Sequence, residues 1–129
     1  MQTKDVRIGK DLVAASAIPL VLAILDEGES YGYAILKRID ELSGGELEWT
    51  DGMLYPLLHR LERLNYVESN WQSVAGERRR KYYRITERGL AELAEQRRQW
   101  DTVVDALKEI WLGLGDLRPP TALPLECRA

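Results

Sequence analysis

The sequence predicts a mainly α-helical fold with one small β-hairpin, followed by a long C-terminal helix. Three observations predict this class. Apolar residues recur at helical spacing, or nearly fill the segment, in three successive stretches before residue 65. Two alternating segments, 66–72 and 79–85, then flank Gly76, which is typical of a hairpin. From residue 87 an apolar stripe recurs every three or four residues up to Leu114.

The first two helices are expected over residues 11–27 and from about Tyr31 to Leu42. The first is so apolar that we expect burial from more than one side. Pro19 should kink it or begin a new helix, because proline lacks the N–H group and clashes with the preceding turn. Ser30 is a candidate N-cap of the second helix, which the glycine pair at 44–45 ends.

A third helix is expected to follow Thr50, a candidate N-cap. Its leucines form one stripe, made of Leu54, Leu57, Leu58, Leu61 and Leu64. A rotation of 100° per residue places Gly52, Pro56, His59 and Arg63 opposite this stripe, with Tyr55 and Arg60 on its flanks. The outer face of this helix therefore carries small, aromatic and basic side chains.

Thr86 is expected to cap a last helix over residues 87–114, with a tail, 115–129, that is rich in glycine and proline. Its stripe is typical of a seam against another helix and is interrupted only by Arg97. The residues expected at a dimer interface are Leu93, Trp100, Val104, Leu107 and Trp111. The predicted organisation is a unit over 1–86, this helix, and a loose tail.

Composition narrows the function. The 129 residues carry a net charge of −3 and one cysteine, Cys127, so an internal disulfide is excluded. The longest apolar run, 14–25, is too short to span a bilayer and no signal peptide is visible, so we expect a cytoplasmic protein without a membrane partner. His59 has no companions at ligand spacing, and no catalytic set is visible. We therefore expect no metal, no cofactor and no enzymatic activity.

The stretch GERRRKYYR, residues 76–84, gathers five cations in an otherwise acidic chain. Three helices followed by a hairpin is the layout of a winged helix-turn-helix, in which the third helix enters the DNA major groove and the hairpin is the wing. The cations then lie beside DNA phosphates, which dominate the affinity of such proteins. Tyr31 is a second phosphate candidate, because helix N-termini favour anions.

The motifs YGYAILKRI, GMLYPLLHRLERLNYVES and RRRKYYRITERG resemble the PadR family of bacterial transcriptional regulators over roughly residues 16–112. The resemblance implies a homodimer, built by the N- and C-terminal helices, that binds double-stranded DNA at a palindromic operator. It also implies a small aromatic or cationic effector near Trp100. Arg97, the polar residue on the apolar seam, and Val104 are the other candidate ligand-binding residues. The candidate DNA-binding residues are Tyr31, Thr50, Asp51, Gly52, Tyr55, His59, Arg60, Arg79, Arg80 and Lys81. We expect a ligand-responsive repressor.

Several alternatives stay open at this stage. A winged-helix dimer could bind a protein partner, or sequester a ligand, without binding DNA, and the acidic net charge favours the protein partner slightly. Trp100 serves either dimer packing or a ligand. Tyr55 either contacts DNA or packs, and His59 either faces the groove or is solvated. Because Tyr82 and Tyr83 point to opposite faces of a strand, only one of them belongs to the core.

Overall fold

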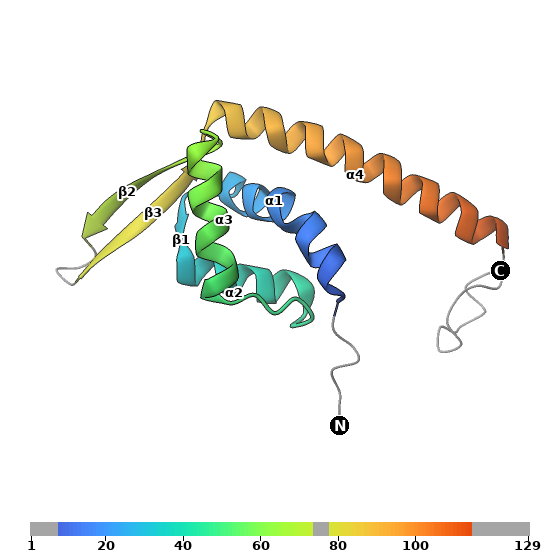
Figure 1. Cartoon of the computed structure of the whole chain (residues 1–129), viewed down its shortest axis with the longest axis horizontal. Coiled ribbons are helices and arrows are strands. Elements are labelled where there is room, and N and C mark those ends of the chain that lie inside the picture. The colour runs from blue at the N-terminus through green and yellow to red at the C-terminus, as the bar shows by residue number, and fades with distance from the viewer. Residues whose placement is uncertain (1–7, 74–77, 115–129) are drawn as a thin grey trace, which may run out of the picture. The chain divides into compact units, whose positions relative to one another are not determined.

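The computed structural model describes residues 8–73 and 78–114, and these ranges contain four helices and three strands (Figure 1). In chain order they are α1 (Lys10–Asp26), β1 (Ser30–Tyr31), α2 (Gly32–Ser43), α3 (Asp51–Arg63), β2 (Val67–Ser73), β3 (Arg79–Ile85) and α4 (Glu87–Leu114). The predicted class is confirmed. The predicted turn at Gly76 and the tail 115–129 lie outside the described residues. The chain forms two compact units, one up to Glu95 and one from Gln96 onward.

The first unit holds one buried core, to which every element up to the start of α4 contributes except the short strand β1. Its buried residues are Val21, Leu22, Ile24, Leu25, Ile35, Ile39, Leu54, Leu58, Leu61, Val67, Tyr83 and Leu93. Leu64, predicted to belong to the α3 stripe, is instead exposed at the end of that helix. Leu42 is likewise exposed at the end of α2. The last member of each stripe is exposed because it lies beyond the part of the helix that packs on the core.

Helix α1 runs through Pro19 as one helix, so the expectation of a new helix there is wrong. An interior proline removes one backbone hydrogen bond and crowds the preceding turn. The part of the helix that follows Pro19 contains four residues that are buried in the core: Val21, Leu22, Ile24 and Leu25. Their burial holds the second half of α1 in place and offsets the loss at the proline.

The connection from α1 to α2 differs from the prediction at Ser30, which does not cap α2. Ser30 and Tyr31 form the short strand β1 and pair with Tyr83 and Tyr82 of β3. Their backbone is extended for this pairing, so α2 begins only at Gly32. At its other end α2 stops at Gly44, whose φ of 63° lies in the left-handed region that glycine adopts without strain.

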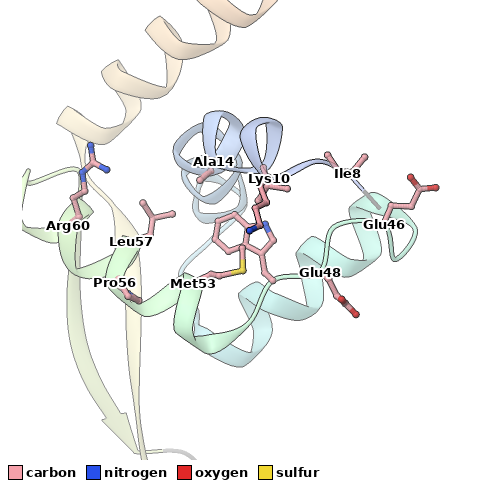
Figure 2. A pocket seen from close by; sticks show the side chains of 12 residues that line it. Ile8, Lys10, Ala14, Glu46, Glu48, Met53, Pro56, Leu57 and Arg60 are labelled. Atoms are coloured by element: carbon pink, nitrogen blue, oxygen red, sulfur yellow. The ribbon is translucent and has the colours of Figure 1, made fainter. Parts of the chain in front are cut away.

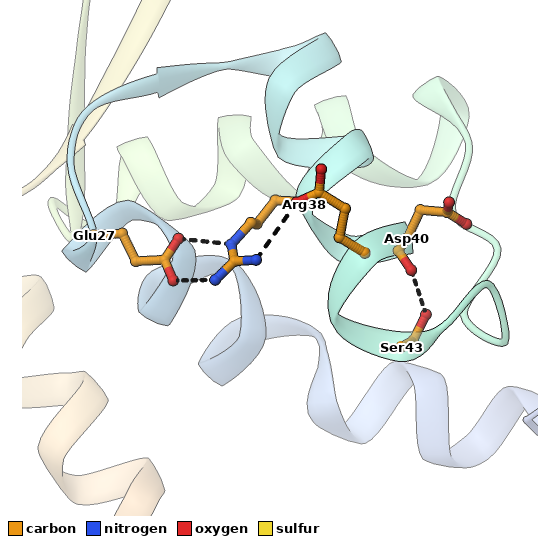
Figure 3. A network of polar contacts seen from close by, with 5 residues as sticks. Glu27, Arg38, Asp40 and Ser43 are labelled. Carbon is orange, nitrogen blue, oxygen red and sulfur yellow. Dashed lines mark hydrogen bonds and ion pairs between the residues drawn. The ribbon is translucent and has the colours of Figure 1, made fainter.

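A cluster of charged side chains ties α1 to α2 on the surface (Figure 3). The Arg38 guanidinium donates to both carboxylate oxygens of Glu27, from Nε at 2.9 Å and from Nη2 at 2.7 Å. It also donates to Glu41 at 3.5 Å. The two-pronged geometry lowers the pKa of the Glu27 carboxyl, chiefly through these hydrogen bonds and further through the attraction of the Arg38 charge.

The three strands form an antiparallel sheet in the order β1-β3-β2. Strand β3 has the predicted bounds and β2 begins one residue later than predicted, while β1 was not predicted. The hairpin register runs from Val67 opposite Ile85 to Ser73 opposite Arg79. In Figure 1 the hairpin extends away from helices α1 to α3, as a wing does.

Helix α4 begins as predicted at a threonine cap. The Thr86 Oγ1 accepts a hydrogen bond from the Gly89 N–H at 3.0 Å, and the Thr86 carbonyl accepts from Leu90. Gly89 is required here, because an added Cβ would strike the backbone carbonyl of Tyr66. None of the helices within residues 8–73 and 78–114 is long and apolar enough to cross a membrane.

Candidate nucleic-acid interface

Helix α3 presents different chemistry on each of its sides. Leu54, Leu58 and Leu61 face the core. The opposite side is exposed and carries Pro56 and His59, as predicted. Thr50 precedes the helix but its side chain makes no capping hydrogen bond, so its predicted capping role is not realised. Thr50 is exposed, and so are Asp51 and Gly52 in the first turn.

The wing sorts its side chains by strand alternation. Tyr83 is 1% exposed and belongs to the core, whereas Tyr82 is half-buried on the other face, which confirms that only one of the pair is core. Lys81 and Arg79 share the Tyr83 face because they lie two and four residues before it. Arg80 lies on the Tyr82 face. The cations of the wing are therefore divided between its two faces.

Aromatic rings accompany these cations on both faces. On the Tyr83 face, Trp71 lies opposite Lys81 in the hairpin, and the Arg79 Cζ is 5.4 Å from the centre of the indole. The Lys81 Nζ lies 6.0 Å from Trp71 and 5.6 Å from the ring centre of Tyr83. On the other face, Arg80 lies 4.3 Å over Tyr31. Each such contact contributes about 0.5–1 kcal/mol at exposed sites and restricts where the cation points.

A groove of about 690 Å³ brings most of the predicted DNA-binding residues together. Its walls come from the start of α2, the exposed flank of α3 and the wing. We call it the wing groove, and its lining consists of Tyr31, Gly32, Tyr33, Tyr55, His59, Trp71, Arg78, Arg79, Arg80, Lys81 and Tyr83. Four cations and several hydrogen-bonding rings thus converge from segments that are far apart in the sequence. This chemistry suits a phosphate backbone.

Four of the predicted DNA-binding residues are not part of the wing groove. Thr50, Asp51 and Gly52 lie at the exposed start of α3. Arg60 lines a different groove on the other flank of α3, facing α1. The sequence reading missed Tyr33, Arg78 and Trp71 as groove residues. The pairing of Trp71 with Lys81 was the available signal, but it depends on the hairpin register, which the sequence pattern left undetermined.

Tyr83, the buried member of the wing-groove lining, has an acidic neighbour outside that lining. Burial, together with the smaller effects of the nearby Glu62 carboxylate and Tyr55 phenol, raises the pKa of the Tyr83 phenol to about 12. The Glu62 carboxylate also accepts a hydrogen bond of 2.7 Å from the Ser69 hydroxyl. Arg84, the last cation of the wing, is engaged with Glu68 at 2.7 Å. It is therefore less available for a phosphate than Arg79 or Lys81.

The predicted dimer and ligand residues lie on α4. Leu93 is 5% exposed and packs in the core of the first unit, so it is not free to form an interface between chains. In the second unit Trp100 and Val104 are half-buried, while Arg97 is exposed. Leu107 and Trp111 are exposed. Of the predicted interface residues, those that remain uncovered therefore lie beyond residue 96.

The family model for "Transcriptional regulator PadR-like family" matches residues 21–95, which is more than half of the chain. The chain belongs to the PadR-like family of transcriptional regulators. This is a family of DNA-binding regulators and not of enzymes. The matched segment runs from the middle of α1 to the first turns of α4 and therefore includes the whole wing groove.

Curated proteins similar to this PadR-like chain include protein X of Lysinibacillus sphaericus, which is uncharacterised and 28% identical over 107 residues, 83% of this chain and 98% of that protein. The transcriptional regulator YqjI of Escherichia coli is 28% identical over 94 residues. That alignment covers 73% of this chain and 44% of YqjI.

Solved structures agree with this family. A transcriptional regulator from Clostridium thermocellum superimposes with a TM-score of 0.71 at 28% identity, covering 78% of this chain and 97% of that one. A PadR family regulator from Eggerthella lenta gives a TM-score of 0.69 at 34% identity, covering 78% of this chain and 86% of that one. The winged-helix fold of this PadR-like protein is therefore shared with known regulators.

Proposed function

We propose that this PadR-like protein is a homodimeric, ligand-responsive transcriptional repressor that binds a two-fold symmetric operator. In this proposal α3 enters the major groove with Tyr55 and His59 at its exposed flank. Arg79, Arg80 and Lys81 of the wing bind phosphates beside it. Tyr31 contributes from the start of α2, where backbone N–H groups also favour an anion.

The convergence of the wing groove is the single observation that carries this proposal. A solvated charge cluster needs no aromatic partners and no particular helix beside it. Here four cations share one groove with the exposed flank of α3, and rings hold three of them in place. A net charge of −3 is compatible with this, because charges beyond roughly 10 Å are screened and the local field dominates.

The proposed dimer rests on the exposed apolar residues of α4. The described part of the second unit, residues 96–114, is one helix, and helices in proteins owe most of their stability to the packing of an apolar face. Val103, Leu107, Ile110 and Trp111 are between 40% and 55% exposed, and both Ile110 and Trp111 follow Leu107 at helical spacing, by three and four residues. A second copy of the chain would cover this stripe. A dimer would also present two α3 helices, one for each of two operator half-sites that lie about 34 Å apart.

Repression follows most simply from occupancy of promoter DNA by such a dimer. An effector bound near Trp100, Arg97 and Val104 would change the spacing of the two α3 helices, and couplings of this kind typically amount to about 1–3 kcal/mol. Support for this part comes from the position of Trp100 on the α4 stripe.

The test is binding to DNA from the protein's own promoter region, measured against a scrambled duplex as salt is raised. We expect tight binding to the native fragment, weakened steeply by salt. The variant Arg79→Ala/Arg80→Ala should bind weakly and lower the salt slope by about 2 for each subunit that touches DNA. Lys37→Ala, which removes an exposed cation of α2 outside the wing groove, should change little.

Two outcomes would contradict the proposal. Equal, weak binding to both duplexes and to fragments selected from the whole genome would favour a winged-helix module that binds a protein partner. A monomeric mass in analytical ultracentrifugation would contradict the proposed homodimer. If the stripe forms the interface, Leu107→Glu should dissociate the dimer, whereas Leu42→Glu, at a somewhat more exposed leucine on α2, should not.

A further inference from the structure

A second groove lies on the other flank of α3, between α3, α1 and the segment 46–49 that precedes α3 (Figure 2). Its volume is about 830 Å³, within the usual range of about 300–1,000 Å³ for small-molecule sites. We call it the α1–α3 groove. Its walls are mainly apolar, and its apolar residues include Val13, Ala14, Ala17, Trp49, Met53 and Leu57. All of these belong to the first unit, so the groove exists within one chain.

Trp49 gives this groove a polar feature that the fold does not use. Its indole Nε1 is buried and has no hydrogen-bond partner among the described residues. A buried donor without a partner costs free energy, so such groups are rare unless something binds them. Because this N–H is covered in the free chain, an acceptor would reach it only after a wall side chain moves. A ligand with an acceptor lying against Trp49 would satisfy it.

The charges around the groove favour a negative acceptor. Lys10 from α1 and Arg60 from α3 both line it. Glu46 and Glu48 belong to the lining as well, but Figure 2 shows both side chains projecting away from the other lining residues. Lys10 instead extends toward Met53 in the same view. Arg60, like the two glutamates, points away from the other lining residues in this view. The groove therefore offers one cation, Lys10, and one buried indole N–H over an apolar floor.

We propose that the α1–α3 groove binds a small apolar molecule with an anionic head group, such as a carboxylate, and that this ligand acts on α3. The apolar body would lie against Met53 and Leu57, and the head group near Lys10 and the Trp49 N–H. The regulatory part rests on the proposed function, because it assumes that α3 binds DNA. This site is separate from the one proposed around Trp100.

Helix α3 is the physical link between the two grooves. Met53, Leu57 and Arg60 line the α1–α3 groove, while Tyr55 and His59 line the wing groove. A ligand wedged between α1 and α3 would shift both sets together, since they are carried by one rigid helix. A ligand changes DNA affinity only if it prefers one position of α3 over another, and contacts with Met53 and Leu57 of α3 would provide that preference.

The first experiment measures binding of 8-anilinonaphthalene-1-sulfonate, an aromatic anion that fluoresces in apolar sites, to the full chain without DNA. N-phenyl-1-naphthylamine serves as the uncharged counterpart. We expect one anion per chain, bound more tightly than the uncharged dye. Met53→Glu should weaken the anion at least tenfold, because it places a carboxylate in the groove wall. Leu42→Glu, the same change at an exposed leucine outside the groove, should leave it unchanged.

Two further variants separate the head-group contacts. Lys10→Gln should weaken the anion about threefold or more and leave the uncharged dye unaffected. Trp49→Phe keeps a six-membered aromatic ring and removes the pyrrole ring with its N–H, so it should weaken the anion at least two- to tenfold, the range expected for one hydrogen bond. Anion binding that is unchanged in Met53→Glu would overturn the site. The site would also be overturned if the wild-type dimer bound no dye and Met53→Glu both dissociated the dimer and allowed dye to bind. In that case the groove would hold the partner's helix in the dimer.

The second experiment adds DNA and distinguishes the two levels of the proposal. Saturating anion should change the affinity for the promoter fragment at least fivefold in the wild type and not in Met53→Glu. Dye binding without any change in DNA affinity would overturn the regulatory part and leave the binding site standing. Dye binding in a protein that recognises no DNA at all would overturn the proposed function instead.

Discussion

The Arg80 guanidinium lies over the ring of Tyr31, with its Cζ 4.3 Å from the ring centre. Tyr31 also meets Tyr82 edge-on, with ring centres 5.3 Å apart and planes inclined by 62°. Tyr31 directly precedes α2, so these two contacts and the pairing of β1 with β3 fasten the wing to the second helix. The placement of a cation of the wing groove therefore depends on a ring about fifty residues away in the sequence.

The first prediction concerns this ring. Tyr31→Ala should weaken binding to the promoter fragment about two- to fivefold per subunit, because Arg80 loses the contact that orients it. Tyr31→Phe keeps the ring and should retain most of the affinity. Fluorescence anisotropy with labelled DNA measures both, and circular dichroism checks that each variant is folded. If Tyr31→Phe is as weak as Tyr31→Ala, the hydroxyl group itself contacts DNA.

The second prediction concerns the approach of Tyr55 to Gly32. A Cβ added at Gly32 would collide with the Tyr55 hydroxyl and the end of its ring. Gly32→Ala should therefore displace Tyr55 or the start of α2, at a cost of about 1–3 kcal/mol in the free energy of unfolding. It should also weaken DNA binding, since both residues line the wing groove. Chemical denaturation and anisotropy measure the two effects.

The double variant Gly32→Ala/Tyr55→Ala is the control for this collision. Removing the ring removes the clash, so the stability lost through Gly32→Ala should be smaller in the Tyr55→Ala background than in the wild type. Equal losses in both backgrounds would show that the cost arises within α2 itself. A double-mutant cycle of this kind isolates the interaction of the two positions.

The sequence was sufficient for the helices, the hairpin and the cationic wing because each has a local signature. Thr86 before a helical stripe predicts the start of α4, and the alternation in 79–85 predicts β3 with its observed ends. Strand β1 escaped prediction because two residues carry no period, and its formation depends on Tyr82 and Tyr83 far along the chain. That pairing also explains why Ser30 does not cap α2.

The candidate site was predictable in part for the same reason. Tyr55 and His59 follow from the rotation of one helix, and Arg79 and Lys81 from the alternation of one strand. Trp71 requires the register of the hairpin, which no local pattern determines. Arg60 was assigned to the DNA face from its flank position, yet that flank faces α1 and lines the α1–α3 groove. A helical wheel gives the direction of a side chain around its own helix, but it does not show which other element lies in that direction.

The third prediction follows from the raised pKa of Tyr83, which is about 12 in the folded chain. An unfolded tyrosine ionises near pH 10, so the unfolded state alone gains charge between pH 10 and 12. The contribution of the neutral, buried phenol is complete below pH 10 and is lost as the pH rises to 12. At that pH the wild type should have lost roughly 2 kcal/mol more than Tyr83→Phe. The free energy of unfolding is measured against pH for the wild type and for Tyr83→Phe, so that the contributions of the other tyrosines cancel in the difference. Parallel curves for the two proteins would contradict the prediction.

The last prediction concerns the Glu27–Arg38 pair, which joins α1 to α2 and has the opposite pH dependence. The Arg38 hydrogen bonds lower the pKa of the Glu27 carboxyl below its ordinary value near 4.5. Its contribution to stability is therefore present above that ordinary pKa and is lost as the pH falls through the lowered one. Arg38→Gln should accordingly destabilise the chain slightly at pH 7 and not at pH 3, because both side chains are exposed and the ion pair is weak in water.

Urea denaturation of Arg38→Gln at both pH values and at two salt concentrations measures this contribution. Lys37→Gln, the neighbouring exposed cation with no ion pair recorded among the described residues, is the matched control and should show no such pH dependence. High salt should shrink the Arg38 effect at pH 7, since exposed pairs are screened. An Arg38→Gln effect that persists undiminished at pH 3 would mean that the arginine acts through its packing on α1 rather than through the charge of Glu27.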